Sequence, residues 1–280
     1  MILWEGPSRI DGQPVVVIAT GLGIPGSSPS RNVKTGPSMI QIWILRSDIH
    51  PTDAIRSGAD LSICGSCFHR GEDPPVESSA IGRRKIRRSR KVRKSVEGNY
   101  VVKRKRTCYV RVANAPAAVY RAFRSGVYRQ VDWSILSGSL SRIGAYGDPA
   151  AVPSWIWHRV ADLARSTAGY THLWKRRPSL RGILMASVDT DEEELDARAR
   201  GWDVFRVESS VGSRSPDMPK AIHCPADRVA RLFADDGSVT CGTCMGKRGP
   251  RCTGRDGSVF IPAHGAGTKQ FQKAMEVVAR

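Results

Sequence analysis

The chain has 280 residues with 44 Lys and Arg against 26 Asp and Glu, so its formal net charge at pH 7 is +18. Its hydrophobic content of 40% fits a folded globular protein, and its length suits one large domain or two small ones. So positive a balance favours a polyanionic partner. We expect this partner to be nucleic acid, most directly DNA, although a ribosomal or capsid-interior protein would show the same balance.

The sequence carries no pattern typical of a membrane or export signal. No apolar run reaches the roughly 18–20 residues that cross a bilayer. The N-terminal stretch MILWEGPSRIDG lacks the basic start and apolar core of a secretory signal. We therefore expect no membrane association and a cytoplasmic location. Because the cytoplasm is reducing, the seven cysteines are predicted to be metal ligands or reactive thiols rather than disulfides.

Hydrophobic periodicity predicts strands that alternate with helices. The predicted strands are 14–20, 39–45, 141–147, 169–174, 182–188 and 202–207, and the predicted helices are 115–126, 154–169 and 191–200. Strands that alternate with helices of about 10–15 residues indicate a parallel sheet or barrel. We predict a single α/β domain over residues 1–280, a TIM-like or partial (β/α) barrel with cysteine-rich metal or cluster loops and a basic insertion.

The predicted insertion, residues 71–107, is a basic arm. Within it, residues 83–106 hold thirteen Lys and Arg and one acid, Glu97, and so carry +12 of the net charge. We expect these cations to contact nucleic-acid phosphates, which gives salt-dependent binding that ignores base sequence. The alternative is a solvated tail. The candidate nucleic-acid-binding residues are Arg83, Arg84, Lys85, Arg87, Arg88, Arg90, Lys91, Arg93, Lys94, Lys103, Arg104, Lys105 and Arg106.

The first group of cysteines has only three members. Cys64 and Cys67 form a C-x2-C motif, and Cys108 follows the arm. Three thiolates can hold a zinc ion or a [4Fe–4S] cluster and leave a fourth position for His69, His50, water or substrate. An open fourth position is typical of a reaction centre. The alternatives are a structural zinc site closed by His69 and a site without metal, and thiolates do not decide between zinc and iron.

The second group of cysteines lies in the C-terminal segment 222–265. Its members are spaced C-x16-C-x2-C-x7-C and are Cys224, Cys241, Cys244 and Cys252. Four cysteines that include a C-x2-C motif can bind a structural zinc ion or a [4Fe–4S] cluster. His223 and His264 are reserve ligands, and the plainer alternative is a set of ordinary thiols.

Three polar residues lie at strand ends, where parallel α/β folds carry their active sites. Asp148 and Asp189 follow two predicted strands, and His172 lies in a short one. All three are candidate catalytic residues, with the histidine binding substrate or acting as acid or base. Asp148 could instead cap the following turn, and His172 could simply pack. Asp189 could simply be a solvated polar residue in the turn ahead of the capping box of Thr190 and Glu193.

Several short motifs occur in a characteristic order. They are CGSCFHR, TCYV, RIGAYGDPAAVP, GYTHLW, LMASVD, GWDVFRV, and HCPA followed by CGTC and a further cysteine. This order resembles that of an uncharacterised family of bacteriophage proteins, over roughly residues 30–265 without the basic arm. The resemblance implies a barrel-like α/β fold with two cysteine clusters. If the protein is phage-encoded, its location is the host cytoplasm.

Two enzyme classes are similar at greater distance. Radical iron–sulfur enzymes hold their cluster with three cysteines after an early barrel strand, the last beside an aromatic residue, as Cys108 stands beside Tyr109. Phage transglycosylases that insert 7-deazaguanines into DNA combine a barrel, strand-end aspartates and a cysteine-rich zinc site near the C-terminus. The cysteine spacing of neither class is reproduced in this chain.

Together these features predict an enzyme that modifies bases in nucleic acid, by base exchange of the 7-deazaguanine transglycosylase type. One of Asp148 and Asp189 would attack the sugar carbon, and the other would act as base on the incoming heterocycle. In the alternative radical version, Cys64, Cys67 and Cys108 hold the reactive cluster, and only there is S-adenosylmethionine a cofactor. A third alternative is a non-catalytic DNA-binding protein in which the metals only stabilise the loops that bind them.

Overall fold

The structure of the protein is a computed structural model that describes most of the chain. The described residues are 1–21, 23–29, 35–71, 106–130, 132–210, 215–227, 240–241, 258–263 and 268–278. Residues 72–105 of the predicted arm lie outside this set, as do Cys244, Cys252 and His264.

The first sheet has five strands in the order β1-β2-β3-β4-β5. They are β1 (Ile2–Pro7), β2 (Pro14–Thr20), β3 (Met39–Arg46), β4 (Leu140–Tyr146) and β5 (Ser166–Ala168). β2 pairs antiparallel with β1 and β3, whereas β4 pairs parallel with β3 and β5. β3 is buried along its whole length, as expected for a strand that is covered on both faces.

The second sheet also has five strands, in the order β6-β7-β8-β10-β9, and all its pairs are parallel. They are β6 (Tyr170–Thr171), β7 (Met185–Val188), β8 (Val204–Glu208), β9 (Ile222–His223) and β10 (Val259–Pro262). Because parallel strands end at the same edge, the residues that follow β6, β7 and β8 are brought to one side of the sheet.

The two sheets join at Gly169, the single residue between β5 and β6. β5 pairs with β4, whereas β6 pairs with β7, and the Gly169 carbonyl accepts a hydrogen bond from Met185 N at 3.0 Å. A Cβ at Gly169 would lie 2.7 Å from Leu184 Cδ2 and 2.8 Å from the Ile143 carbonyl oxygen. The strand therefore changes partners at a point where only glycine allows the backbones to approach so closely.

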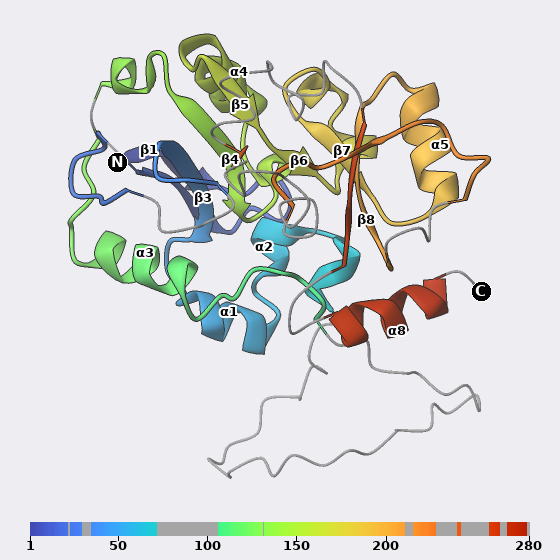
Figure 1. Cartoon of the computed structure of the whole chain (residues 1–280). Helices are drawn as coiled ribbons and strands as arrows, with labels where there is room; N and C mark the ends of the chain where they lie inside the picture. Colours follow the sequence, from blue (N-terminus) through green and yellow to red (C-terminus); the bar gives the residue numbers. More distant parts are fainter. Residues whose placement is uncertain are drawn as a thin grey trace, which may run out of the picture.

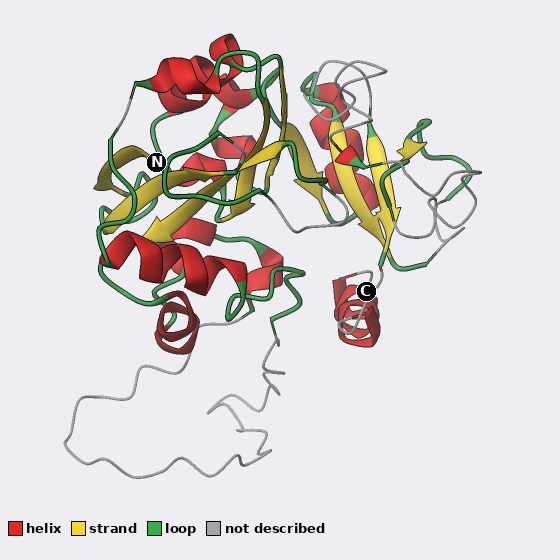
Figure 2. Cartoon of the chain, turned by 60° about the vertical axis from the view of Figure 1, so that its left-hand side comes forward, coloured by secondary structure: helices red, strands yellow, loops and turns green. Residues whose placement is uncertain are grey.

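Helices cover both sides of the first sheet (Figures 1 and 2). α1 (Pro51–Ser57) and α3 (Ala115–Arg124) lie on one side, and α4 (Ser154–Leu163) lies on the other. α4 buries Ile156, Trp157 and Val160, a spacing that puts all three side chains on one helix face. The hydrophobic core thus runs through the first sheet on both of its faces.

Two further helices and several short turns complete the described chain. α5 (Asp191–Ala199) connects β7 to β8 and packs against both strands, and α8 (Thr268–Val278) lies near the end of the chain (Figure 1). The short elements are α2 (Leu61–Cys64), η1 (Phe68–Arg70), η2 (Trp133–Leu136), η3 (Pro149–Ala151), η4 (Trp174–Arg176) and η5 (Pro178–Leu180).

The α/β class is confirmed, but the barrel is not. In the described residues the strands form two sheets without closing into a barrel. A (β/α) barrel needs parallel strands that are each followed by a helix, whereas β1, β2 and β3 form an antiparallel meander. The helix predicted over 154–169 was wrong in its second half, because it ends at Leu163 and β5 follows.

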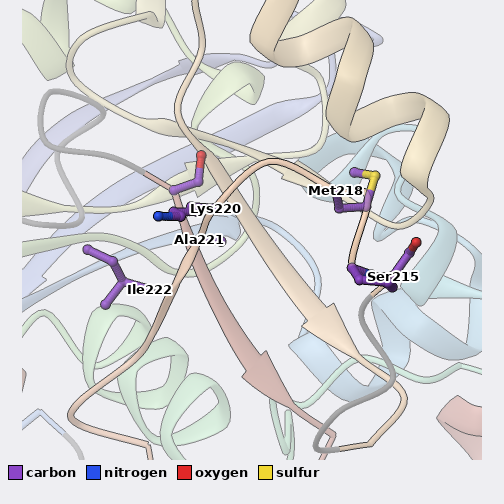
Figure 3. A pocket seen from close by; sticks show the side chains of 7 residues that line it. Ser215, Met218, Lys220, Ala221 and Ile222 are labelled. Atoms are coloured by element: carbon purple, nitrogen blue, oxygen red, sulfur yellow. The ribbon is translucent and has the colours of Figure 1, made fainter.

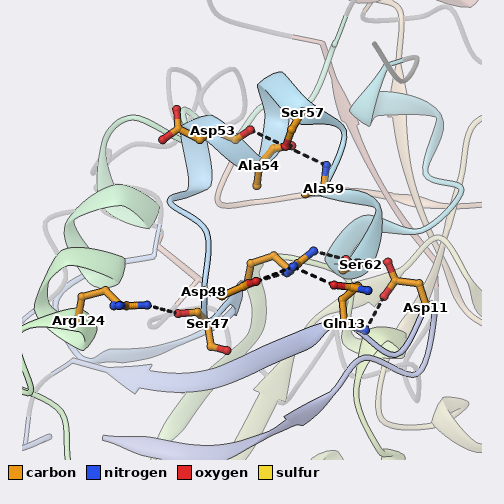
Figure 4. Close-up of polar contacts among 11 residues, drawn as sticks. Asp11, Gln13, Ser47, Asp48, Asp53, Ala54, Ser57, Ala59, Ser62 and Arg124 are labelled. Atoms are coloured by element: carbon orange, nitrogen blue, oxygen red, sulfur yellow. Dashed lines mark hydrogen bonds and ion pairs between the residues drawn. The ribbon is translucent and has the colours of Figure 1, made fainter. Parts of the chain in front are cut away.

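A buried arginine, Arg46, fixes the position of α2; its partners Asp48 and Ser62 are labelled in Figure 4. Arg46 ends β3 and is 5% exposed; it donates to Asp48 through Nε and Nη2, both at 2.9 Å, and through Nη1 to Ser62 Oγ at 3.0 Å. Ser62 Oγ donates in turn to Asp11 at 2.7 Å. Charge-assisted bonds of this kind are stronger than neutral ones. They tie α2, and with it Cys64, to the end of β3.

Replacing Gly169 by alanine is expected to destabilise the protein by about 2–3 kcal/mol, because the new Cβ would overlap a backbone carbonyl that cannot move aside. A urea denaturation curve followed by tryptophan fluorescence measures this loss. Gly138→Ala is the matched control, since Gly138 has a φ of 69° but open space around it, and about 1 kcal/mol of backbone strain is expected. Equal losses in the two variants would contradict a tight junction.

Candidate functional site

Predicted metal ligands and predicted catalytic residues lie close together where β3, β4, β6 and β7 end. The chain leaves β3 through α1 and α2 to the C-x2-C motif, and it leaves β4 into η3. His172 follows β6, and Asp189 follows β7. In open α/β folds, this edge of the sheet is where ligands bind. We call the following residues the edge cluster: Cys64, Cys67, His69, Cys108, His172 and Asp189.

The three thiols of the edge cluster lie close enough to influence one another. Cys67 N donates to the Cys64 carbonyl at 3.2 Å, and Cys108 N donates to the His69 carbonyl at 3.0 Å. Burial, and then the neighbouring Cys67, hold the pKa of Cys64 well above its usual value. Burial raises the pKa of Cys67 to about 12 and also raises the pKa of Cys108. The thiols are therefore protonated at neutral pH unless a bound metal displaces their protons.

Two buried ion pairs join the segments that carry these thiols. Asp60, 2% exposed, accepts from Arg70 Nη2 at 2.9 Å and from Arg106 Nη1 at 3.1 Å. Arg106 was predicted to contact phosphate, but its side chain is 18% exposed and belongs to this folded edge. In the described residues, Arg106 Nη2 and Tyr146 Oη are buried without a hydrogen-bond partner. Both are donors near Cys64: the charge of Arg106 lowers the pKa of Cys64 against the larger effect of burial, and burial and then Cys64 raise the pKa of Tyr146.

His69 stands between an aspartate and a threonine. Its Nε2 lies 2.8 Å from Asp189 Oδ1, and its Nδ1 lies 2.8 Å from Thr107 Oγ1. The ring is 8% exposed and stacks on Phe271 of α8, with 5.4 Å between ring centroids. Burial opposes ionisation of Asp189, but the hydrogen bond from His69 and its charge outweigh burial and hold the pKa of Asp189 below its usual value. Asp189 is therefore a carboxylate at neutral pH.

His172 completes this side of the edge cluster. Its Nε2 lies 3.0 Å from Ser187 Oγ of β7, and its ring centroid lies 5.5 Å from that of His69 at an interplanar angle of 71°. One potential ligand atom from each of His69, His172 and Asp189 lies within 4.8 Å of the other two. Within the described chain, the three cysteine sulfurs do not form a group as compact as this.

Asp148 has the capping role that the sequence left as an alternative. Its Oδ1 accepts from Ala150 N at 2.9 Å and from Thr171 Oγ1 at 2.6 Å, and its Oδ2 accepts from His172 N at 2.8 Å. The residue is 7% exposed, and burial raises the pKa of its carboxyl group. Both carboxylate oxygens are thus engaged by the protein, unlike those of a residue that presents its carboxylate to a substrate.

The predicted capping box is present in altered form, and the change positions Asp189. Thr190 Oγ1 accepts from Glu193 N at 3.1 Å, as in a capping box. The Glu193 carboxylate, however, accepts from Asp189 N at 2.9 Å rather than from the backbone of the cap residue. The first turn of α5 therefore holds the backbone of Asp189 while its side chain faces His69.

The other predicted residues lie elsewhere. Cys224 and Cys241 pack against one hydrophobic cluster of the second sheet, whereas Cys244 and Cys252 are outside the described residues. The described part of the chain contains no disulfide at these cysteines. The twelve predicted phosphate-binding residues from 83 to 105 are also outside the described set.

Sequence reasoning missed four neighbours of the edge cluster. Thr107 could have been found as the residue beside Cys108, and Asp60 as an acid just before the C-x2-C motif. No local signal connects Ser187 with His172, because the pairing depends on two neighbouring parallel strands. Phe271 is more than 200 positions away from His69 in the chain, so its stacking arises only from the folded structure.

A separate hollow of about 630 Å³ lies beside β9 (Figure 3). It is lined by Ser215, Pro216, Met218, Lys220, Ala221, Ile222 and Ser258. Among the described residues, no predicted site residue lines it and Lys220 is its single ionisable side chain, so we do not place the reaction there. Among the described helices, none is long and apolar enough to cross a membrane.

Comparison of the chain with models of protein families, with curated proteins and with solved structures finds no match. The resemblance to a bacteriophage family therefore stays a prediction. The candidate site is defined by its geometry alone.

Replacing Asp148 by alanine is expected to lower the free energy of unfolding by about 3 kcal/mol, because three buried donors lose their acceptor. Urea denaturation measures the change. Asp53→Ala is the control, since Asp53 is an exposed partner of Arg56, and less than about 0.5 kcal/mol is expected. If Asp148→Ala were as stable as the parent, the carboxylate would not be a structural cap.

Proposed function

We propose that this chain is a metal-dependent enzyme that modifies bases in nucleic acid, in particular DNA. The observation that carries the proposal is the way in which the basic arm is anchored. Thr107 N and Cys108 N both donate to the His69 carbonyl at 3.0 Å. The chain that enters the arm and the chain that leaves it are thus bonded to each other inside the edge cluster, and the ion pairs of Asp60 reinforce this closure.

Because the arm is anchored at the edge cluster, its positive charge would hold nucleic acid next to that cluster. Twelve Lys and Arg lie between residues 83 and 105. Phosphate contacts made by such a segment would hold a nucleic-acid strand without selecting its sequence. Because both ends of the segment are fixed at the edge cluster, the bound strand would be kept at high local concentration beside the ionisable groups. A tail attached elsewhere on the surface would not have this effect.

In this proposal the metal centre, a zinc ion or a [4Fe–4S] cluster, is held by Cys64, Cys67 and Cys108, whose sulfurs would have to move closer together to share one zinc ion. The unpartnered donors Arg106 Nη2 and Tyr146 Oη suit a centre that is made negative by three thiolates. In this proposal His69 is not the fourth ligand of the thiol centre, because its two nitrogens face Asp189 and Thr107 rather than the thiols. The fourth position would thus be open to a small molecule. Bound zinc would supply Lewis-acid chemistry, and a bound cluster would supply electron transfer.

The two aspartates differ in how well they suit the proposed base exchange. Base exchange of the transglycosylase type was expected to use two aspartates. Asp189 suits such a role, since it is ionised and its Oδ2 makes no hydrogen bond with the described residues. Asp148 does not, because it is engaged as a cap. This difference favours the radical iron–sulfur version as a second candidate, since that version needs three thiolates and an open position but no second carboxylate.

The arm is tested by replacing the Lys and Arg between 83 and 105 with glutamine while retaining Arg106, which the fold needs. DNA binding at low salt is expected to weaken at least about tenfold, with a flatter dependence of affinity on salt. Fluorescence anisotropy with a labelled DNA strand measures both effects. Arg56→Gln, which removes one exposed cation, serves as control. Unchanged affinity and salt dependence would refute the role of the arm.

The chemistry is tested with protein purified without oxygen. Metal and sulfide analysis of the parent and of Cys108→Ser is expected to show that the variant loses the centre proposed on Cys64, Cys67 and Cys108. A cluster absorbs near ~400 nm, and zinc leaves the protein colourless. Mass spectrometry of nucleosides from the DNA of expressing cells is expected to show an altered base with the parent and not with Cys108→Ser. Unaltered DNA with a metal-loaded parent would indicate a non-catalytic DNA-binding protein instead.

A further inference from the structure

We propose that His69, His172 and Asp189 form a second metal site, which binds one divalent cation of the manganese and iron type. The site is distinct from the cysteine centre and does not depend on the proposed reaction. Two imidazoles and one carboxylate are the donor set of mononuclear sites that keep several coordination positions open. In this chain they come from three separate segments, after α2, β6 and β7, which the parallel strands bring to one edge.

The distances require little adjustment for an ion to bind. His69 Nε2 and Asp189 Oδ1 are 2.8 Å apart, and the three potential ligand atoms all lie within 4.8 Å of one another. Metal bonds from imidazole and carboxylate of about 2.0–2.2 Å place neighbouring ligand atoms about 3 Å apart. The cation would therefore replace the proton between His69 and Asp189, and the ring of His172 would move in to complete the set.

The surroundings of the two histidines match those of metal ligands. A ligating histidine usually directs its second nitrogen to a polar partner that fixes the ring. Thr107 Oγ1 is such a partner for His69 Nδ1 at 2.8 Å. A hydroxyl can donate or accept, so Thr107 can follow the change of tautomer when Nε2 becomes a ligand, without movement of the ring. Ser187 Oγ lies 3.0 Å from His172 Nε2, so it can hold that ring in place when Nδ1 is the ligand atom.

Charge and packing also favour a cation here. The carboxylate of Asp189 lies 2.8 Å from His69 Nε2, where it can share a cation with that nitrogen. Its backbone is held by Glu193, and the imidazole of His69 is stacked against Phe271. Ligands held on both sides in this way lose little freedom on binding. Oxygen and nitrogen donors suit manganese and iron, whereas the neighbouring thiols suit zinc or an iron–sulfur cluster, so the two sites would select different metals.

Titration with Mn²⁺ tests the site, because the electron paramagnetic resonance signal of free Mn²⁺ disappears on binding and because thiols compete poorly for this ion. The parent is expected to bind one Mn²⁺ per chain. His172→Ala and Asp189→Asn are expected to weaken binding by more than ~100-fold, and Thr107→Val by roughly 10–100-fold, since it removes only the partner that orients His69. His158→Ala is the matched control, because His158 is exposed and its ring hydrogen-bonds to the Ser179 carbonyl, away from the edge cluster; its binding should equal that of the parent.

Two results would overturn this inference: no Mn²⁺ bound by the folded parent, or equal affinity in the parent, His172→Ala and Asp189→Asn. Circular dichroism of each variant shows whether it is folded, and Asp189→Asn keeps the size of the side chain if His172→Ala does not fold. Cys64→Ser separates the two sites, since it should keep the Mn²⁺ site and lose the thiol-bound metal. Mn²⁺ binding together with unaltered DNA would leave the cation site standing while the proposed function fails.

Discussion

The edge of the sheets depends on one buried carboxylate, that of Asp148. Its two oxygens hold the first turn after β4, the hydroxyl of Thr171 in β6 and the backbone of His172. Its own N–H donates to the Ile63 carbonyl at 2.6 Å, one residue before Cys64. Burial raises the pKa of this carboxyl group, and the donors around it favour its ionised form. The first cysteine and the second histidine of the edge cluster are therefore positioned from a single residue.

The sequence indicated the elements of the site better than it indicated how they are arranged. The buried runs at 14–20 and 39–45 and the C-x2-C motif could be recognised locally, because periodicity and spacing are local properties. Asp189 and His172 were selected as candidates because strand ends carry function in α/β folds, and the structure brings both to the edge cluster. The barrel was wrong because the pairing directions of β1, β2 and β3 are set by turns and register, which hydrophobic patterns do not report.

Asp148 shows why a motif leaves a role undecided. An aspartate before a proline predicts a cap as readily as it predicts an active-site carboxylate, since both occur after a strand. The choice is made by Thr171 and the backbone of His172, which lie more than twenty residues later. The pairing of His69 with Asp189 could not be predicted from the sequence either, because the two residues are 120 positions apart in the chain. Contacts of this range arise from the parallel packing of strands.

The anchoring of the basic arm also bears on how freely that segment can vary. Its two ends are fixed to each other by two hydrogen bonds to one carbonyl and by the ion pairs of Asp60. The cost of closing a loop rises only slowly with its length. A segment that starts and finishes at the same point can thus be lengthened, shortened or exchanged with little strain on the residues that close it. The fold separates the basic segment from the residues of the edge cluster, so the two can evolve at different rates.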